Sequence, residues 1–174
     1  MTNKKGFTLM ELLIVVIMIS GFVVIAYPTY TSSIERARAS EAVTMLGAIK
    51  AAQEKNYVMY EEYATNFREI RDFTPAVSTD EADDPSLRFN LDSNNFRTEY
   101  FKYTMTSEGA GLSKKYFTKA ERITANGQLA NKGYGLTVYY NDDFISCNGT
   151  TDDGRKICAS LTDQEGTNGS YKIY

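Results

Sequence analysis

The chain has 174 residues, no histidine and no tryptophan, and its charged side chains sum to a net charge of −3. This length suggests one domain, and without histidine the commonest general base and the commonest metal ligand are missing. The basic residues are scattered, so we expect no nucleic-acid surface. The 13 tyrosines and nine phenylalanines are more typical of a β-rich domain or a packing interface than of a catalytic cleft. No spacing of Ser, Asp and Glu residues indicates an enzyme.

An apolar stretch runs from Phe7 to Tyr27 and contains one charged residue, Glu11. A carboxylate within a membrane span costs about 2.5 to 3.5 kcal/mol on insertion scales and usually has a function and a specific partner. Basic residues followed by an apolar run fit three interpretations. The first is a secretory signal cleaved after 24–26, and the second is a plain signal anchor. The third is a short leader, Met1 to Gly6, removed in front of Phe7.

Glu11 favours the third interpretation, because neither a secretory signal nor a simple anchor gains anything from a buried acid. Cleavage after Gly6 creates a new α-amine at Phe7, four residues before Glu11. Positions i and i+4 are one helical turn apart and share a face. The amine and the carboxylate could pair within one chain, or the carboxylate could neutralise the amine of a neighbouring chain. The second arrangement makes another copy of the chain an obligatory partner.

The segment Gly6-Phe7-Thr8-Leu9-Met10-Glu11-Leu12 resembles the cleavage and methylation signature of type IV pilins and of the related pseudopilins of type II secretion systems. The resemblance continues through Leu13 to Ala26, through Tyr27-Pro28 and through Arg36 to Ala42. It extends to about residue 55 of this chain. It implies that a prepilin peptidase on the cytoplasmic side cuts between Gly6 and Phe7 and N-methylates Phe7. It also implies that Glu11 sets the register of subunits during assembly.

The resemblance implies a structural subunit of a type IV pilus, assembled as a homo-oligomeric helical filament. The subunit would be a single-pass inner-membrane protein before assembly and part of an extracellular pilus on the cell surface afterwards. Its partners would be prepilin peptidase, an inner-membrane assembly platform and minor pilins, with no cofactor. The alternative is a pseudopilin of a type II protein secretion system. The C-terminal cysteine pair, the tyrosine-rich sheet and the lack of an evident acidic C-terminal calcium loop favour the pilin.

Gly21 and Pro28 are predicted to weaken the helix, since proline removes a hydrogen bond and glycine is a poor helix former. They are either ordinary residues of a membrane helix, where neighbours tolerate them, or the ends of a segment that unwinds in the filament, as the resemblance implies. Beyond Pro28 an amphipathic pattern resumes, with charged residues opposite an apolar row. The row consists of Ala39, Ala42, Leu46, Ile49, Gln53, Tyr57, Tyr60 and Ala64. A helix from Phe7 to Tyr63 would span about 85 Å at 1.5 Å per residue. We therefore expect its apolar half to project, first into a bilayer and later into a bundle of like helices.

The remainder of the chain is predicted to form an antiparallel meander packed on the second half of the helix, an α+β fold. Strands are expected at about 101–105, 116–124, 134–140 and 144–147, where apolar and polar residues alternate. An acidic run at 80–84 is predicted to be solvated surface. The predicted segments are a leader at 1–6, an apolar helix at 7–28, an amphipathic helix at 29–64, a connecting loop at 65–98 and the sheet with a C-terminal loop at 99–174.

Cys147 and Cys158 are the only cysteines. Export to an oxidising compartment favours a disulfide over two free thiols, and closure of so short a loop would contribute about 2 to 3 kcal/mol. Two cysteines without histidine are too few for a metal site. The resemblance implies that the bond bounds a surface-exposed region tied to subunit contacts and adhesion. We expect a loop at 148–157 and a flexible end at 166–170.

Overall fold

The computed structural model describes residues 7–67, 69–70, 95–110, 114–123, 133–162 and 169–173. The chain divides into two compact units, Met1–Glu35 and Arg36–Tyr174. Helix α1 (Leu9–Tyr60) begins in the first unit and ends in the second. The expectations for the leader, for the acidic run at 80–84 and for most of the connecting loop lie outside the described residues.

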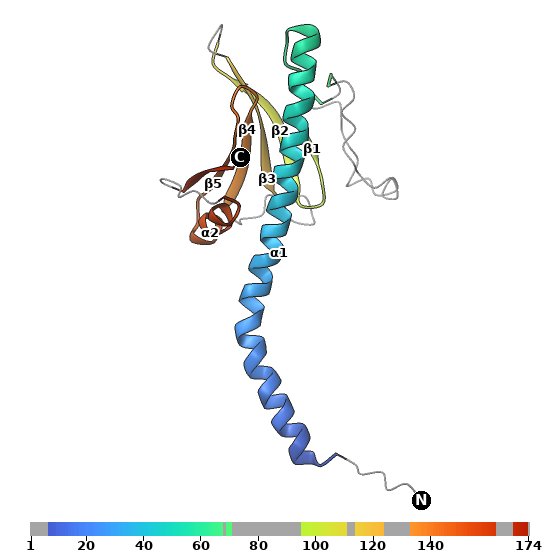
Figure 1. Ribbon diagram of the computed structural model, residues 1–174, viewed down its shortest axis with the longest axis vertical. Helices are drawn as coiled ribbons and strands as arrows, with labels where there is room; N and C mark the ends of the chain where they lie inside the picture. The colour runs from blue at the N-terminus through green and yellow to red at the C-terminus, as the bar shows by residue number, and fades with distance from the viewer. Residues whose placement is uncertain are drawn as a thin grey trace, which may run out of the picture. The chain divides into compact units, whose positions relative to one another are not determined.

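The second unit contains a sheet of six strands that pair in chain order, each antiparallel to its neighbour (Figure 1). The strands are β1 (Asn95–Arg97), β2 (Phe101–Glu108), β3 (Lys115–Arg122), β4 (Tyr134–Tyr139), β5 (Ile145–Gly149) and β6 (Ser170–Ile173). The predicted meander is therefore confirmed, and its four expected strands correspond to β2 to β5. The two edge strands were not predicted. Ser170 begins β6, so the end of the segment expected to be flexible is instead paired with β5.

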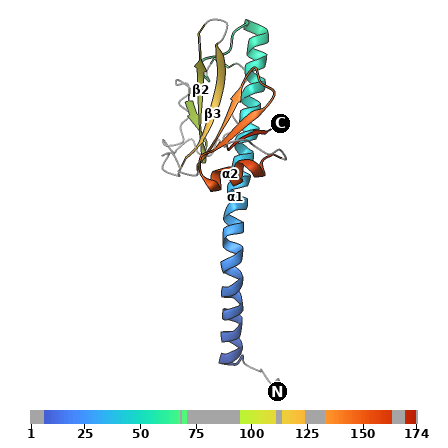
Figure 2. The same ribbon diagram turned by 90° about the vertical axis from the view of Figure 1, so that its left-hand side faces the viewer.

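A second helix, α2 (Asp152–Ser160), occupies most of the segment where a loop was expected (Figure 2). The hydroxyl of Thr151 caps this helix by accepting a hydrogen bond of 3.1 Å from the N–H of Gly154. Asp152 and Asp153 lie in its first turn, where carboxylates interact favourably with the helix dipole. The expectation of a loop was wrong, because the Thr151 cap and the two aspartates after it favour the start of a helix at this point.

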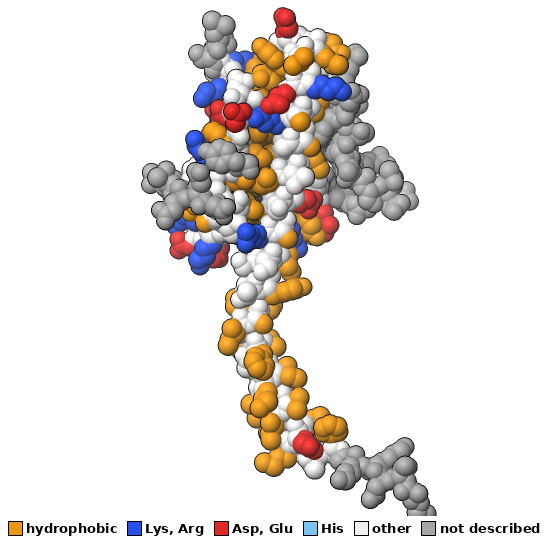
Figure 3. All heavy atoms as spheres, viewed as in Figure 1, with side chains coloured by type: hydrophobic (Ala, Val, Ile, Leu, Met, Phe, Trp, Pro, Cys, Tyr) orange, Lys and Arg blue, Asp and Glu red, His pale blue; other side chains and the backbone are white. Residues whose placement is uncertain are grey.

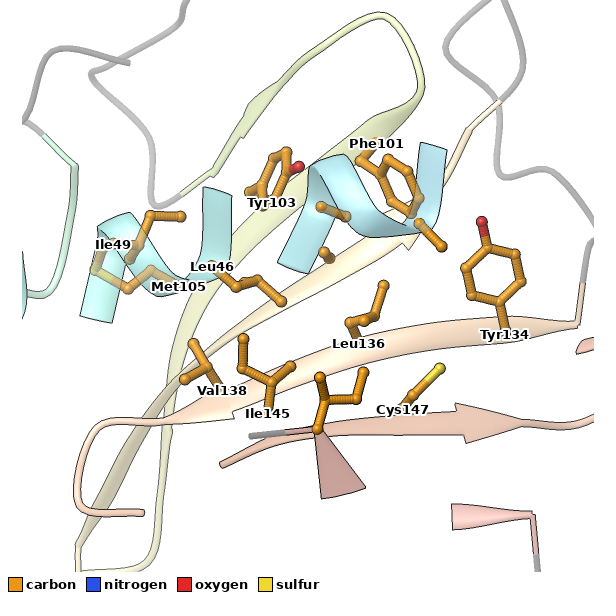
Figure 4. Close-up of a cluster of buried hydrophobic side chains, with 14 of the residues drawn as sticks. Leu46, Ile49, Phe101, Tyr103, Met105, Tyr134, Leu136, Val138, Ile145 and Cys147 are labelled. Carbon is orange, nitrogen blue, oxygen red and sulfur yellow. The ribbon is translucent and has the colours of Figure 1, made fainter. Parts of the chain in front are cut away.

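The core forms between α1 and one face of the sheet (Figure 4). The helix contributes Ala39, Ala42, Leu46, Ile49 and Gln53, all fully buried as expected. The sheet contributes alternating residues, among them Phe101, Tyr103, Met105, Leu136 and Val138. The alternation predicted for these strands is thereby confirmed.

The apolar row of α1 departs from the prediction after Gln53. Asn56 is buried, whereas Tyr57 and Tyr60 are 46% and 48% exposed. The buried positions alternate in steps of three and four, so Asn56 rather than Tyr57 follows Gln53 on the stripe. The helix also ends at Tyr60, four residues earlier than predicted.

The early end of α1 has a local cause at Glu61. This residue has a φ of 59°, and its N–H donates a hydrogen bond of 2.8 Å to the carbonyl of Tyr57. This is the left-handed C-terminal cap that usually uses glycine or asparagine. The reversal directs the chain back along α1 and brings Ala64 against Gln53, where Ala64 is buried.

Candidate functional site

The first turn of α1 is closed by reciprocal hydrogen bonds between Thr8 and Glu11. A carboxylate oxygen of Glu11 accepts from the Thr8 N–H at 3.1 Å and from the Thr8 hydroxyl at 3.0 Å. The Glu11 N–H donates in return to the Thr8 hydroxyl oxygen at 3.3 Å. Thr8 precedes the first helical residue and Glu11 is the third within the helix, so the pair forms a capping box.

The capping box gives Glu11 a partner that the sequence interpretation did not include. Its proposed partner, the amine of Phe7, exists only after cleavage between Gly6 and Phe7. In the uncut chain Thr8 satisfies the carboxylate instead. The signal for Thr8 was present in the sequence, because threonine three residues before glutamate at the start of an apolar helix is a known capping pattern. Gly6 lies outside the described residues, and the roles of Gly6, Phe7 and Glu11 stay predictions.

Behind the capping box, α1 exposes apolar side chains on every side. All residues from Phe7 to Ser33 are exposed, and Figure 3 shows hydrophobic side chains covering this part of the helix on the face in view. The segment is long and apolar enough to cross a bilayer. A helix that is apolar all round is stable only when a bilayer or other protein surfaces cover it.

Gly21 and Pro28 both lie within the continuous α1. A Cβ added at Gly21 meets no atom within 4 Å. After Pro28, the hydroxyls of Thr31 and Ser33 donate to the carbonyls of Pro28 and Thr29, each at 3.0 Å. Threonine and serine hydroxyls commonly donate to the carbonyl three or four residues earlier in a helix. The single chain therefore offers no packing reason for Gly21, and unwinding in an assembly stays a prediction.

The predicted disulfide between Cys147 and Cys158 is confirmed, with the two Cα atoms 5.5 Å apart. Cys147 lies in β5 and Cys158 in α2, and both are fully buried. The bond thus fastens α2 to the sheet, where the sequence suggested that it would enclose a loop. Next to it, Gly149 lies so close to α2 that an added Cβ would be 2.5 Å from the backbone nitrogen of Arg155.

The described residues contain no group of three or more Asp, Glu, Cys or His side chains that could hold a metal ion. The acidic run at 80–84 is outside them.

Three curated proteins named fimbrial protein are similar to part of this chain. The relative from Moraxella nonliquefaciens is 43% identical over 56 residues, which are 32% of this chain and 36% of the relative. Two relatives from Neisseria meningitidis, of serogroups A and B, are each 35% identical over 65 residues, 37% of this chain and 38% of the relative. The matches therefore span little more than a third of the relatives' length. No protein-family model and no solved structure matches the chain.

Proposed function

We propose that this chain is a structural subunit of a type IV pilus and that its copies assemble through the apolar half of α1. One observation carries the proposal: every residue from Phe7 to Ser33 is exposed, and this surface is apolar except for Glu11 and a few hydroxyls. Such a surface needs either lipid or like helices around it. The similarity to fimbrial proteins over 56 to 65 residues supports a final environment of like helices in a filament.

Before assembly, the apolar half of α1 would cross the inner membrane once. About 20 apolar residues are needed to span the hydrocarbon core, and the segment 7–28 is long enough. Glu11, close to the start of α1, would lie at the cytoplasmic end of the span, where hydrogen bonds from Thr8 satisfy its carboxylate. The remaining part of the chain would face the oxidising side, in agreement with the Cys147–Cys158 disulfide.

Processing would then change the partners of Glu11. We propose that prepilin peptidase cuts between Gly6 and Phe7 and methylates the new amine of Phe7. The resemblance of the segment 6–12 supports this step. The new positive charge would lie next to Thr8 and compete with it for the Glu11 carboxylate. An amine–carboxylate pair shielded from water is stronger than the neutral hydrogen bonds from Thr8.

Assembly would follow from this pairing. If Glu11 of one copy neutralises the Phe7 amine of the next, the contact is heterologous and does not close on itself, so it generates a helical filament. Each added subunit would bring its own unpaired amine and carboxylate into register. An inner-membrane assembly platform and minor pilins would be the other partners. The completed filament would be extracellular, on the cell surface.

The decisive experiment has two parts. Mass spectrometry of the mature chain should show an N-terminus at a methylated Phe7, whereas an N-terminus after residue 26 would refute the proposal. Electron microscopy of fibres sheared from cells, combined with mass spectrometry of their subunits, should find this chain in the fibres. If the fibres lack this chain and its deletion blocks protein secretion, the chain is a pseudopilin.

A further inference from the structure

A cavity of about 510 Å³ lies in the second unit, where the end of α1 meets the start of β3 and the turn after β4. Its volume is within the range of small-molecule sites. The cavity is lined by three tyrosine rings, two carboxylates, one ammonium, one threonine and one asparagine. The lining residues that the argument uses are Tyr57, Glu61, Glu62, Tyr63, Lys114 and Tyr116. The assembly proposed above makes no use of this cavity.

The aromatic wall of the cavity is held in place by contacts among its own members. The rings of Tyr57 and Tyr63 are stacked, with centroids 4.6 Å apart and planes 23° from parallel. Tyr63 also contacts Tyr116 at 5.4 Å, and its hydroxyl donates to the side-chain oxygen of Asn141 at 2.7 Å. Tyr57 remains 46% exposed, so part of its ring is accessible from the solvent. The wall is therefore preorganised rather than assembled on binding.

The charged groups of the cavity are not paired with one another. Within the described part of the chain, Glu61 and Glu62 form no ion pair, and both are exposed. The ammonium of Lys114 lies 4.7 Å from the centre of the Tyr116 ring instead of on either carboxylate. The cavity thus already accommodates one cation against a tyrosine face, and it keeps two negative charges beside the other rings.

The backbone of Glu61 is a separate indication that its carboxylate has a role. Its φ of 59° places it in the left-handed region, where glycine or asparagine would be less strained. Strained residues of this kind cluster at functional sites. The cap alone explains the conformation but not the choice of glutamate.

We propose that this cavity binds one organic cation, an alkylammonium or guanidinium group. Such a group gains attraction from the tyrosine faces and from the carboxylates of Glu61 and Glu62 together. An anion would meet two like charges, and a neutral saccharide would leave those carboxylates without a counter-charge. Among the described residues that line the cavity, Lys114 is the only cation, and its position over the ring of Tyr116 makes it a modulator of cation affinity.

The test uses the full chain in micelles of a polyoxyethylene detergent, because that headgroup contains neither sugar nor amine. Choline and N-acetylarginine methylamide serve as cationic probes, and N-acetylglucosamine serves as the neutral one. Binding is measured by isothermal titration calorimetry and by saturation-transfer NMR. We expect both cations to bind and the sugar not to bind. Tighter binding of choline would indicate that the bound cation belongs to a small amine. Tighter binding of the arginine probe would indicate that it belongs to a basic side chain of a peptide.

Variants separate a binding site from a structural feature. Tyr57→Ala should weaken cation binding about three- to tenfold, the range of a partly desolvated cation–π contact. Glu61→Gln and Glu62→Gln should each weaken it about two- to fivefold, as for exposed ion pairs. Lys114→Met should strengthen it about two- to fivefold, because a like charge is removed. Glu41→Gln, an exposed glutamate of α1 that does not line the cavity, should leave affinity unchanged.

Glu61→Gly provides the second readout, because it relaxes the backbone and removes the carboxylate at once. We expect a higher melting temperature together with weaker cation binding. Unchanged cation affinity in this more stable variant would overturn the proposal. So would weaker binding in Lys114→Met, or binding of the sugar in place of the two cations.

Discussion

The carboxylate of Glu11 accepts two hydrogen bonds from Thr8, at 3.1 Å from its N–H and at 3.0 Å from its hydroxyl. This local pairing stabilises the start of α1 in the uncut chain. Any role of Glu11 between subunits must therefore be separated from its role as a helix cap. Glutamine allows this separation, since it serves in a capping box and carries no charge.

We predict that Glu11→Gln is cut at Gly6 as efficiently as the wild type but assembles poorly. The expected loss of filament is about tenfold or more, because removing one partner of a buried charge pair usually costs about 2 to 5 kcal/mol. Cleavage is followed by mass spectrometry and assembly by the amount of the chain in sheared fibres.

Thr8→Val is the matched control. It removes the hydroxyl but leaves the N–H and the charge, so we expect a small loss of helix stability and nearly normal assembly. If Glu11→Gln assembles like the wild type while Thr8→Val does not, capping rather than charge is what assembly requires.

Gly21 lies in the continuous apolar helix with open space around it. We predict that Gly21→Ala stabilises α1 in the unassembled chain by about 1 kcal/mol and yet reduces filament yield, because the proposed unwinding between Gly21 and Pro28 becomes harder. Helix content in micelles and yield of sheared fibres measure the two effects. Gly47 is an equally open helical glycine in the second unit. The variant Gly47→Ala should stabilise the helix by a similar amount and assemble normally. Normal filaments from both variants would contradict the unwinding proposal.

Sequence periodicity predicted the buried stripe of α1 from Ala39 to Gln53 because a strong hydrophobic pattern there coincides with a real core face. It did not predict the end of the helix. The three- and four-residue spacing of apolar positions continues in the sequence through Tyr57, Tyr60 and Ala64. The left-handed turn at Glu61 ends the helix, and glutamate is a poor signal for such a turn.

β2 and β4 were predictable because an apolar residue is buried at every second position, as at Phe101, Tyr103 and Met105 of β2. β1 and β6 are too short for such a pattern to emerge. The edge strand β6 is formed through pairing with β5, a long-range contact that single-sequence reasoning does not detect. At the candidate site, Glu11 was evident as a charge in an apolar run. Its partner Thr8 was not predicted, because the charged Phe7 amine that cleavage would create is a stronger partner for a carboxylate than a neutral hydroxyl.

The close approach of Gly149 to α2 predicts a large effect of a single methyl group. An added Cβ would lie 2.5 Å from the nitrogen and 2.7 Å from the Cα of Arg155, and both are backbone atoms that cannot rotate away. We expect Gly149→Ala to lower the free energy of unfolding by about 1 to 3 kcal/mol, as for other overpacked sites. Urea denaturation measures the loss, and proteolysis should show earlier cleavage within α2. If Gly149→Ala changes neither the free energy of unfolding nor the cleavage within α2, then α2 can move away from β5 despite the disulfide.

Gln53 is a buried amide that pairs with the backbone of Ala64 in both directions. Its nitrogen donates to the Ala64 carbonyl at 3.0 Å, and its oxygen accepts from the Ala64 N–H at 2.9 Å. We predict that Gln53→Leu lowers the free energy of unfolding by about 2 to 4 kcal/mol, because volume is kept but two buried backbone groups lose their partners. Ala51→Leu on the exposed side of the same turn should change it by less than about 0.5 kcal/mol. Similar unfolding curves for the two variants would show that the amide pairing contributes little.

The same network predicts a loss of stability at alkaline pH. Burial raises the pKa of Tyr140 to about 12, although hydrogen bonding with the side chains of Thr118 and Gln53 opposes the shift. The folded chain therefore holds this proton more tightly than the unfolded chain, in which the pKa is near 10. The contribution of Tyr140 to the free energy of unfolding is fully present below about pH 10. It is lost as the pH rises through about 12, and the total loss is about 2 to 3 kcal/mol.

Tyr140→Phe isolates the contribution of this one phenol. The variant should be less stable at neutral pH, because Thr118 loses its 2.6 Å hydrogen bond in the core. Between pH 10 and 12, however, its free energy of unfolding should fall less steeply than that of the wild type. Burial also raises the pKa of Tyr103, and this residue is present in both proteins. The stability of the variant therefore still falls with pH, but less steeply than that of the wild type. Equal slopes from urea denaturation across this range would show that Tyr140 does not couple its proton to folding.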